Sequence, residues 1–207
     1  MAGIVLLRHG ETQWSRSGRH TGRTDVPLTS GGQRAASSLA PRLAGHDFAF
    51  VACSPLRRAR ETARLAGLTP DAYLDDLLEW DYGGFEGRTT DEIRLETGDP
   101  DWVIWDAHVP AGQTPGEQPE DVARRCAAVL GRCRPFLDSG RDVALVAHGH
   151  LLRILTATWL GLEPRCGRLF MLQTGRISYL SFERSQHVID LWNAGTFEPT
   201  AGAAHNT

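Results

Sequence analysis

Two histidines share the same sequence setting, each at the end of a short apolar segment and each followed by glycine. His9 follows the apolar residues 3–8, and His148 follows residues 142–147. Short, continuous apolar runs are typical of buried parallel strands, and ligands bind outside the carboxyl ends of such strands. We therefore expect both imidazoles to face one crevice, where the glycines allow a ligand to approach the backbone closely.

Arginine supplies all of the basic side chains near these histidines. The chain has 22 lysine and arginine residues together, and none of them is lysine. The absence of lysine excludes a Gly-Lys-Ser/Thr phosphate-binding loop and any lysine Schiff base. Arg58 lies in the first turns of a helix predicted to begin at Ser54-Pro55, where paired guanidinium donors and free backbone N–H groups suit phosphate. Glu79 lies in aromatic, glycine-rich surroundings, where we expect desolvation to favour the protonated, proton-donating form of its carboxyl group.

Each of these residues also has a simpler structural interpretation. An isolated histidine is often a hydrogen-bonded core residue, and Glu79 could be an ordinary surface carboxylate. The pair His148 and His150 has the spacing of two metal ligands, but no third ligand is suitably spaced, so no metal site is predicted. Tyr82 and His20 fit either a substrate pocket or packing. Trp105 fits the core slightly better than a pocket lid, and Trp102 and His150 are left open.

Four motifs in the chain resemble those of the histidine phosphatase superfamily, which includes the cofactor-dependent phosphoglycerate mutases. In order, they are Arg8-His9-Gly10-Glu11-Thr12, Ser54-x-Leu56-x-Arg58-Ala59-x-x-Thr62-Ala63, Leu78-Glu79 and Ala147-His148-Gly149. Residues 79–87, with Thr89-Thr90, look more like the acid phosphatase and sugar-bisphosphatase branches than like true mutases. The resemblance implies a three-layer α/β/α sandwich with a mostly parallel mixed sheet, as in phosphoglycerate mutases.

The resemblance also implies a role for each motif residue. His9 would be the nucleophile that attacks phosphorus and becomes a phosphohistidine, kept neutral by nearby cations. Arg8, Arg58 and His148 would hold the phosphoryl oxygens in the transition state. Glu79 would protonate the departing alkoxide and then deprotonate the attacking water. The remaining substrate contacts would come from Ser15, Thr21, Gly22 and Gly149, and the pH optimum would be acid to neutral.

Strands and helices alternate along the chain, which predicts the α/β class. Strands are expected at 3–8, 48–53 and 142–147, with a closing antiparallel pair at 177–182 and 187–192. Helices are expected at 30–43, from Ser54-Pro55 to Ala66, at 119–137 and from His148 to Trp159. The long stretch 67–118 is interpreted as turn-rich and irregular. A single domain over 1–192 is predicted, followed by a flexible tail over 193–207.

The composition of the 207 residues excludes several classes of partner. The net charge is −3, which favours neither nucleic acid nor an anionic membrane. The start of the chain has no signal-peptide pattern, and no apolar stretch approaches a membrane span. We interpret the four cysteines as reduced core residues of a cytoplasmic protein, without a disulfide or zinc framework. They are Cys53, Cys126, Cys133 and Cys166.

These observations favour a metal-independent phosphatase that hydrolyses small phosphomonoesters through a phosphohistidine. The branch resemblance, and no single residue, points to sugar phosphates. The alternatives are phosphoglycerate mutase-type phosphoryl transfer and an inactive phosphate-binding module. No cofactor is expected, the expected partner is a small phosphorylated substrate, and a homodimer is compatible with the family.

Overall fold

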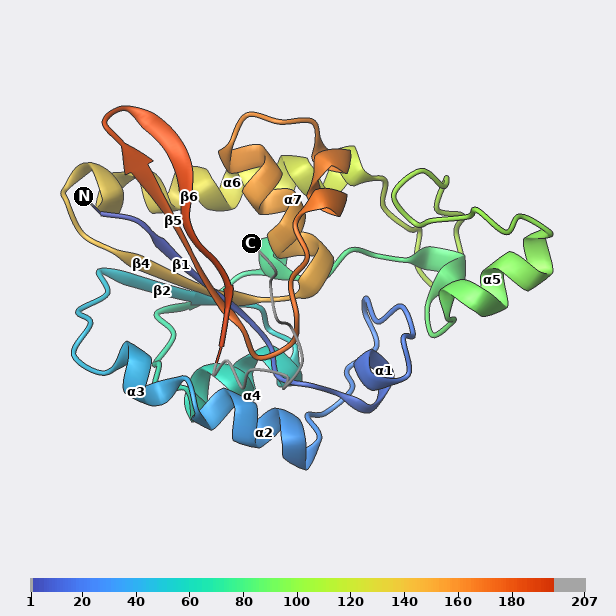
Figure 1. The fold of residues 1–207 in the computed structure, drawn as a ribbon, viewed down its shortest axis with the longest axis horizontal. Helices are drawn as coiled ribbons and strands as arrows, with labels where there is room; N and C mark the ends of the chain where they lie inside the picture. The colour runs from blue at the N-terminus through green and yellow to red at the C-terminus, as the bar shows by residue number, and fades with distance from the viewer. Residues whose placement is uncertain (1, 196–207) are drawn as a thin grey trace, which may run out of the picture.

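The structure is a computed structural model that describes residues 2–195, and a six-stranded mixed sheet runs through its centre (Figure 1). The strands are β1 Ile4–Arg8, β2 Phe50–Cys53, β3 Ala72–Tyr73, β4 Val143–Ala147, β5 Ile177–Glu183 and β6 Gln186–Ala194. Their order in the sheet is β3-β2-β4-β1-β5-β6. The first four run parallel to one another, whereas β5 pairs antiparallel with both β1 and β6. The mostly parallel mixed sheet predicted from the sequence is confirmed.

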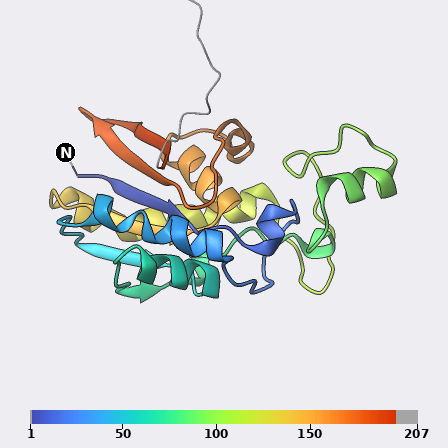
Figure 2. The same cartoon turned by 60° about the horizontal axis from the view of Figure 1, so that its bottom comes forward.

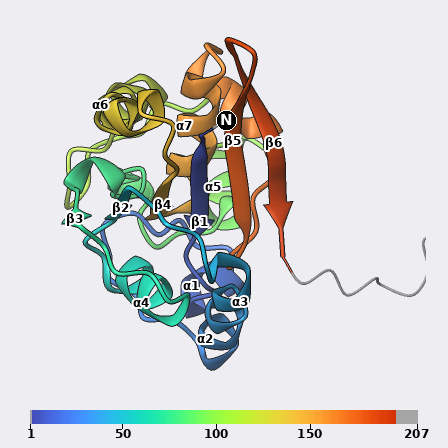
Figure 3. The same cartoon turned by 90° about the vertical axis from the view of Figure 1, so that its left-hand side faces the viewer.

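Alternate residues of the strands face opposite layers of helices. In β1, Ile4 and Leu6 belong to a core shared with two helices, and Val5 and Leu7 belong to the core on the other face. Figure 3 shows the two helical layers on either side of the sheet. The helices are α6 Pro119–Asp138 and α7 Gly149–Trp159 on one face, and α2 Ser30–Ser37, α3 Ala40–Leu43 and α4 Arg57–Leu65 on the other. Because both faces are covered, β1 is apolar from Ile4 to Leu7, and the three-layer α/β/α architecture is confirmed.

The helix predicted over 30–43 is divided into α2 and α3. Pro41 lies in the first turn of α3, where its missing N–H group has no helical partner to lose. A continuous helix would need that N–H group. The single-helix prediction was therefore wrong, and Pro41 is the reason.

The helix predicted to begin at Ser54-Pro55 begins instead at Arg57, with Leu56 as its N-cap. The Ser54 hydroxyl lies 2.7 Å from Nε2 of His148. The Arg57 N–H group donates to Oδ1 of Asp25 at 2.8 Å. A carboxylate remote in sequence therefore accepts from the first N–H group of α4, which is not available to phosphate in this structure.

The stretch 67–118 is more regular than expected: it begins with β3 of the sheet, and its later part around residues 90–97 projects from one end of the molecule (Figure 2). It contains the helix α5, Thr90–Thr97, and two short 3-10 turns, η1 Asp75–Leu77 and η2 Gly83–Phe85. Thr89 and Glu92 cap α5 reciprocally, and Gly98 ends it in the left-handed conformation. The remaining short helices are α1 Gln13–Arg16 and η3 Pro164–Leu169.

The C-terminal strand, the lengths of the helices and the cysteines bear on three further predictions. Strand β6 extends to Ala194, two residues beyond the expected end of the domain, and the rest of the predicted tail, 196–207, lies outside the described residues. No helix within residues 2–195 is long and apolar enough to cross a membrane. All four cysteines are free thiols. Three are buried as predicted, but Cys166 is only partly buried and is not a core residue.

Candidate active site

The register of β1 and β4 brings the two strand-end histidines together. Arg8 pairs with Ala147 in the parallel ladder, and the His9 N–H group donates to the Ala147 carbonyl at 3.0 Å. His9 and His148 are the residues that directly follow β1 and β4, and their ring centroids are 5.1 Å apart. Adjacent parallel strands therefore place the imidazoles at one edge of the sheet, as their sequence settings predicted.

A backbone carbonyl fixes the tautomer of His9. Nδ1 of His9 lies 2.7 Å from the Gly10 carbonyl oxygen, which can only accept, so Nδ1 carries the proton. In the neutral ring, Nε2 then holds the free lone pair. Burial, and then the charges of Arg58 and Arg8, hold the pKa of His9 well below the usual 6.5. His9 is thus a neutral imidazole with an unprotonated Nε2, which is the form a nucleophile requires.

His148 has the opposite tautomer. Its Nδ1 accepts from Nε of Arg58 at 3.1 Å, so its Nε2 donates to the Ser54 hydroxyl. The ring is fully buried, and burial followed by the Arg58 charge holds the pKa of His148 well below its usual value. Both ring nitrogens of His148 therefore have protein partners, and one of them holds the Arg58 side chain in place. His148 is not among the residues that line the cavity.

The two arginines expected to hold phosphate occupy different positions. Arg58 is 1% exposed, and besides His148 it donates to three backbone carbonyls of the loop after His20. These carbonyls belong to Thr21, Gly22 and Thr24. Arg8 lines the cavity, with one N–H donor on the Leu172 carbonyl and a buried Nε that has no partner among residues 2–195. Of these two arginines, Arg8 therefore lies beside the cavity, whereas Arg58 is bonded to His148 and does not line it.

The glycines after the histidines make room for protein atoms. A Cβ on Gly10 would lie 2.3 Å from the Gly32 carbonyl oxygen. A Cβ on Gly149 would lie 3.0 Å from Cζ of Arg8. Protein atoms therefore lie where a Cβ would be at these positions, and contact between these glycines and a ligand stays a prediction.

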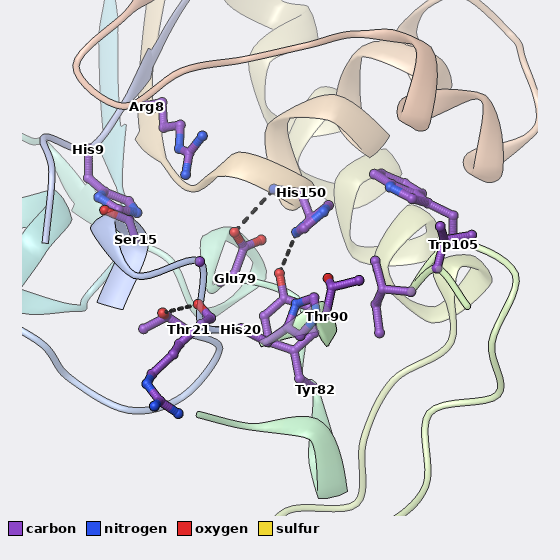
Figure 4. A pocket seen from close by; sticks show the side chains of 14 residues that line it. Arg8, His9, Ser15, His20, Thr21, Glu79, Tyr82, Thr90, Trp105 and His150 are labelled. Carbon is purple, nitrogen blue, oxygen red and sulfur yellow. Dashed lines mark hydrogen bonds between the residues drawn. The ribbon is translucent and has the colours of Figure 1, made fainter. Parts of the chain in front are cut away.

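The Glu79 carboxylate lies at the N-terminus of α7. Its Oε1 accepts from the N–H groups of Trp80 at 3.0 Å and Leu151 at 2.8 Å, and its Oε2 accepts from that of His150 at 3.1 Å. Three N–H donors and the positive end of a helix suit an ionised carboxylate. The expected bias toward the protonated form is therefore not supported by this geometry, although the side chain does line the cavity (Figure 4).

The cavity that these side chains border has a volume of about 350 Å³. Of the predicted site residues, Arg8, His9, Ser15, Thr21, Glu79 and Tyr82 line it, whereas Arg58, His148, Gly22 and Gly149 do not. The Gly22 N–H group donates to both Glu86 carboxylate oxygens, at 3.0 and 2.9 Å, so it is not available to phosphate. The hydroxyls of Ser15 and Thr21 bond to nearby backbone, although both residues remain at the cavity wall.

The sequence did not predict a cavity position for several of the lining residues. His20, His150 and Trp105 line the cavity, and Trp102 does not, although its ring meets that of His20 edge-on. Trp105, expected in the core, belongs both to the core and to the cavity wall. Four lining residues had no sequence signal, and Thr90 was noted only as part of the branch motif; the four are Gly18, Arg19, Val103 and Ile104. Among residues 2–195, no three His, Cys, Asp or Glu side chains are grouped to hold a metal ion.

Arg125 of α6 fixes the segment that carries Glu79. Its guanidinium donates to the carbonyls of Asp76 at 2.9 Å, Leu78 at 2.7 Å and Glu79 at 3.1 Å. It also forms a two-pronged pair with Glu117, at 2.7 and 2.9 Å. Both partners are mostly buried, so this pair is shielded from solvent screening.

We expect Arg125→Met to lower the free energy of unfolding by about 2 to 3 kcal/mol, because Glu117 and three carbonyls lose their donor. Urea unfolding measures the change. The matched control is Arg124→Met, one residue away, whose guanidinium is 76% exposed and pairs with Asp121. The control should change stability by less than about 0.5 kcal/mol. Equal losses in the two variants would contradict the structural role of Arg125.

Comparisons with known proteins agree with this architecture. The family model described as histidine phosphatase superfamily (branch 1) matches residues 4–195. An acid phosphatase of Mycobacterium tuberculosis is 42% identical over 183 residues, which is 87% of this chain and 86% of that protein. The sedoheptulose 1,7-bisphosphatase of Saccharomyces cerevisiae is 31% identical over 238 residues, covering 98% of this chain and 88% of that protein.

Further similarity extends to a protein with a different name and to a solved structure. A Cronobacter sakazakii protein named "Probable phosphoglycerate mutase GpmB" is 33% identical over 197 residues, covering 93% of this chain and 90% of that protein. A solved structure of a Mycobacterium tuberculosis open reading frame superposes with a TM-score of 0.85 at 38% identity, over 94% of this chain and 98% of that one.

Proposed function

We propose that this chain, which belongs to the histidine phosphatase superfamily (branch 1), hydrolyses small phosphomonoesters through a phosphohistidine at His9. The observation that carries the proposal is the His9 tautomer. With Nδ1 bonded to the Gly10 carbonyl, Nε2 is free to attack. The attacking ring borders a cavity that also holds the Arg8 guanidinium and the Glu79 carboxylate.

The first half-reaction forms the bond from Nε2 of His9 to phosphorus and breaks the bond from phosphorus to the ester oxygen. Arg8 stabilises the charge on the equatorial oxygens, and the buried Arg58 adds a second positive field beside His9. Glu79 passes to the departing oxygen a proton that it first takes from the phosphate ester. Because Glu79 is bonded as a carboxylate in the free protein, a monoanionic phosphate ester would bring that proton, since its second pKa is about 6.

The second half-reaction returns the site to its starting state. Glu79, now a carboxylate, takes a proton from a water molecule. The water oxygen bonds to phosphorus as the bond to Nε2 breaks, which releases the neutral His9 ring. Glu79 then passes the proton to the departing inorganic phosphate and is a carboxylate again. No metal ion takes part in either proposed step.

A panel of phosphomonoesters assayed for phosphate release, with EDTA present throughout, tests the proposal. We expect turnover in EDTA, and a requirement for added metal would contradict the proposed mechanism. A second reaction contains 3-phosphoglycerate and a bisphosphate primer. Rapid formation of 2-phosphoglycerate without free phosphate would identify a mutase instead. Phosphate release from no ester would identify an inactive binding module.

The lowered pKa of His9 predicts the acid limb of the activity profile. A free histidine is half protonated at about pH 6.5, and its protonated ring has no nucleophilic lone pair. Because the pKa of His9 lies well below that value, its ring stays neutral as the pH falls through 6.5. We expect kcat/KM to lose its His9-dependent activity only at pH values well below 6.5.

Substrate ionisation must be separated from that of the enzyme in this profile. Esters whose second phosphate pKa values differ are compared over the same pH range. A limb whose midpoint pH differs between esters reports ionisation of the substrate. A limb with the same midpoint for all esters reports ionisation of the enzyme. A common limb at pH 6.5 or above would contradict the lowered pKa of His9.

A further inference from the structure

The cavity has two ends of different chemistry. Figure 4 shows Arg8 and His9 at one end, Trp105 at the other, and Glu79 between them. The end beyond Glu79 is lined by side chains without formal charge at neutral pH. Those labelled in Figure 4 are His20, Tyr82, Thr90, Trp105 and His150, and Val103 is a further lining residue two positions before Trp105 in the chain. In the proposed function the phosphoryl group occupies the Arg8 end, so the leaving group of the ester faces these neutral residues.

The imidazoles in this wall are held in their neutral forms. Burial lowers the pKa of His20 to about 4, and burial and then the Arg153 charge lower the pKa of His150 well below its usual value. The Tyr82 hydroxyl lies 2.5 Å from Nδ1 of His150, and burial raises the pKa of Tyr82 well above its usual value. Tyr82 is therefore the donor and His150 the acceptor, with no charge on either ring.

The second lining cation is already paired. Arg19 lies 3.2 and 3.3 Å from the two carboxylate oxygens of Glu92, and it also donates to the Gly87 carbonyl. Of the charged side chains that line the cavity, Arg8 is used by the phosphoryl group and Glu79 is negative. A second anionic group on the substrate would therefore lose its hydration without gaining an unpaired cation.

The wall is better suited to a polyol than to a plain hydrocarbon. Nε2 of His20 is buried and has no hydrogen-bond partner in the part of the chain that the structure describes. A substrate hydroxyl within reach of His20 would supply one, as would the side-chain hydroxyl of Thr90 for a second substrate group. The Arg153 guanidinium lies over the Trp105 ring, with Cζ 4.6 Å from the ring centroid, and the remaining ring surface can contact the carbon-bound hydrogens of a polyol or sugar.

We propose that this cavity selects monophosphates of neutral polyols or sugars and disfavours esters with a second phosphate or a carboxylate. This inference rests on the proposed function and adds the substrate class. It assigns the discrimination to the wall formed by His20, Tyr82, Thr90, Val103, Trp105 and His150.

Two esters that differ only at the far carbon test the selection. Glycerol 3-phosphate ends in a hydroxymethyl group, and 3-phosphoglycerate has a carboxylate in its place. We expect kcat/KM to be at least about tenfold higher for glycerol 3-phosphate, the loss for 3-phosphoglycerate reflecting an unpaired, desolvated anion. 4-Nitrophenyl phosphate serves as the activity reference. All three are assayed by phosphate release.

A cation introduced into the wall should reverse part of this preference. Val103→Arg is the first variant, and Thr90→Arg is the second, in case the first does not fold. Either should narrow the ratio of kcat/KM between the two esters at least fivefold, through a lower KM for 3-phosphoglycerate. The control is Leu95→Arg on α5, which makes the same change of charge at a side chain that is 87% exposed and outside the cavity. The control should keep the wild-type ratio.

The outcomes separate this inference from the proposed function. Equal kcat/KM values for the two esters would overturn the inference and leave the phosphatase proposal standing. The inference would also fail if the folded wall variants kept the same ratio as Leu95→Arg. Phosphate release from none of the three esters would overturn the proposed function, and this inference with it.

Discussion

His9→Ala should lower kcat for phosphate release by about four orders of magnitude or more, as the loss of a nucleophile does in other covalent mechanisms. The alanine removes Nε2, and the nearest comparable ring cannot replace it. Both nitrogens of His148 are bonded, one to Arg58 and one to Ser54. Steady-state assays with several esters measure the loss.

The matched control for this prediction is His108→Ala, because His108 is exposed. It should leave kcat unchanged. A rapid acid-free quench with labelled ester adds a direct readout, since a phosphohistidine is expected in the wild type and none in His9→Ala. A phosphoenzyme that still forms without His9 would place the nucleophile elsewhere.

Glu79→Gln should separate esters by their leaving groups. Alkyl phosphates need a proton on the departing oxygen, so their kcat is expected to fall by about a hundredfold or more. Aryl phosphates such as 4-nitrophenyl phosphate leave without that proton and should lose less than about tenfold. The amide oxygen of glutamine can still accept from Trp80 and Leu151, which keeps most of the local hydrogen bonding in place.

Glu163→Gln is the control for this substitution, since Glu163 is exposed and outside the cavity. It should affect neither class of ester. A plot of log kcat against leaving-group pKa should become steeper in Glu79→Gln and stay parallel to the wild type in Glu163→Gln. Equal slowing of alkyl and aryl esters by Glu79→Gln would assign Glu79 a purely structural role.

The convergence of His9 and His148 could be predicted because it follows from strand order and strand ends. Each histidine ends a buried apolar run, and neighbouring parallel strands must bring such ends to one edge. The α6 helix was predictable for a similar reason, since its apolar stripe is long and regular. In these places local pattern and global fold agree.

The partners of buried polar groups could not be predicted in this way. Gly22 is expected to bind phosphate by its motif position, yet its N–H group donates to Glu86, 64 residues further along the chain. Arg58 likewise bonds to the loop that carries Thr21 and Gly22. Pairings between loops depend on the complete fold, and a linear motif contains no information on which acceptor lies nearest.

Two local features were predictable from the sequence but were missed. Thr89 and Glu92 have the spacing of a capping box, and Gly98 has the position of a helix-ending glycine, which together mark α5. Pro41 similarly marks the end of α2 before α3. By contrast, the inward position of Val103 and Ile104 has no periodic signal, because they lie in an irregular segment.

The two ends of the cavity come largely from different parts of the chain. His9 is tied into the middle of the sheet through its bond to the Ala147 carbonyl, whereas Val103 and Trp105 belong to the projecting segment (Figure 2). Insertions and exchanges in that segment can therefore accumulate during evolution without displacing the attacking nitrogen. Related proteins can therefore differ in substrate while they keep the same catalytic residues, and the same segment can be varied in engineered proteins.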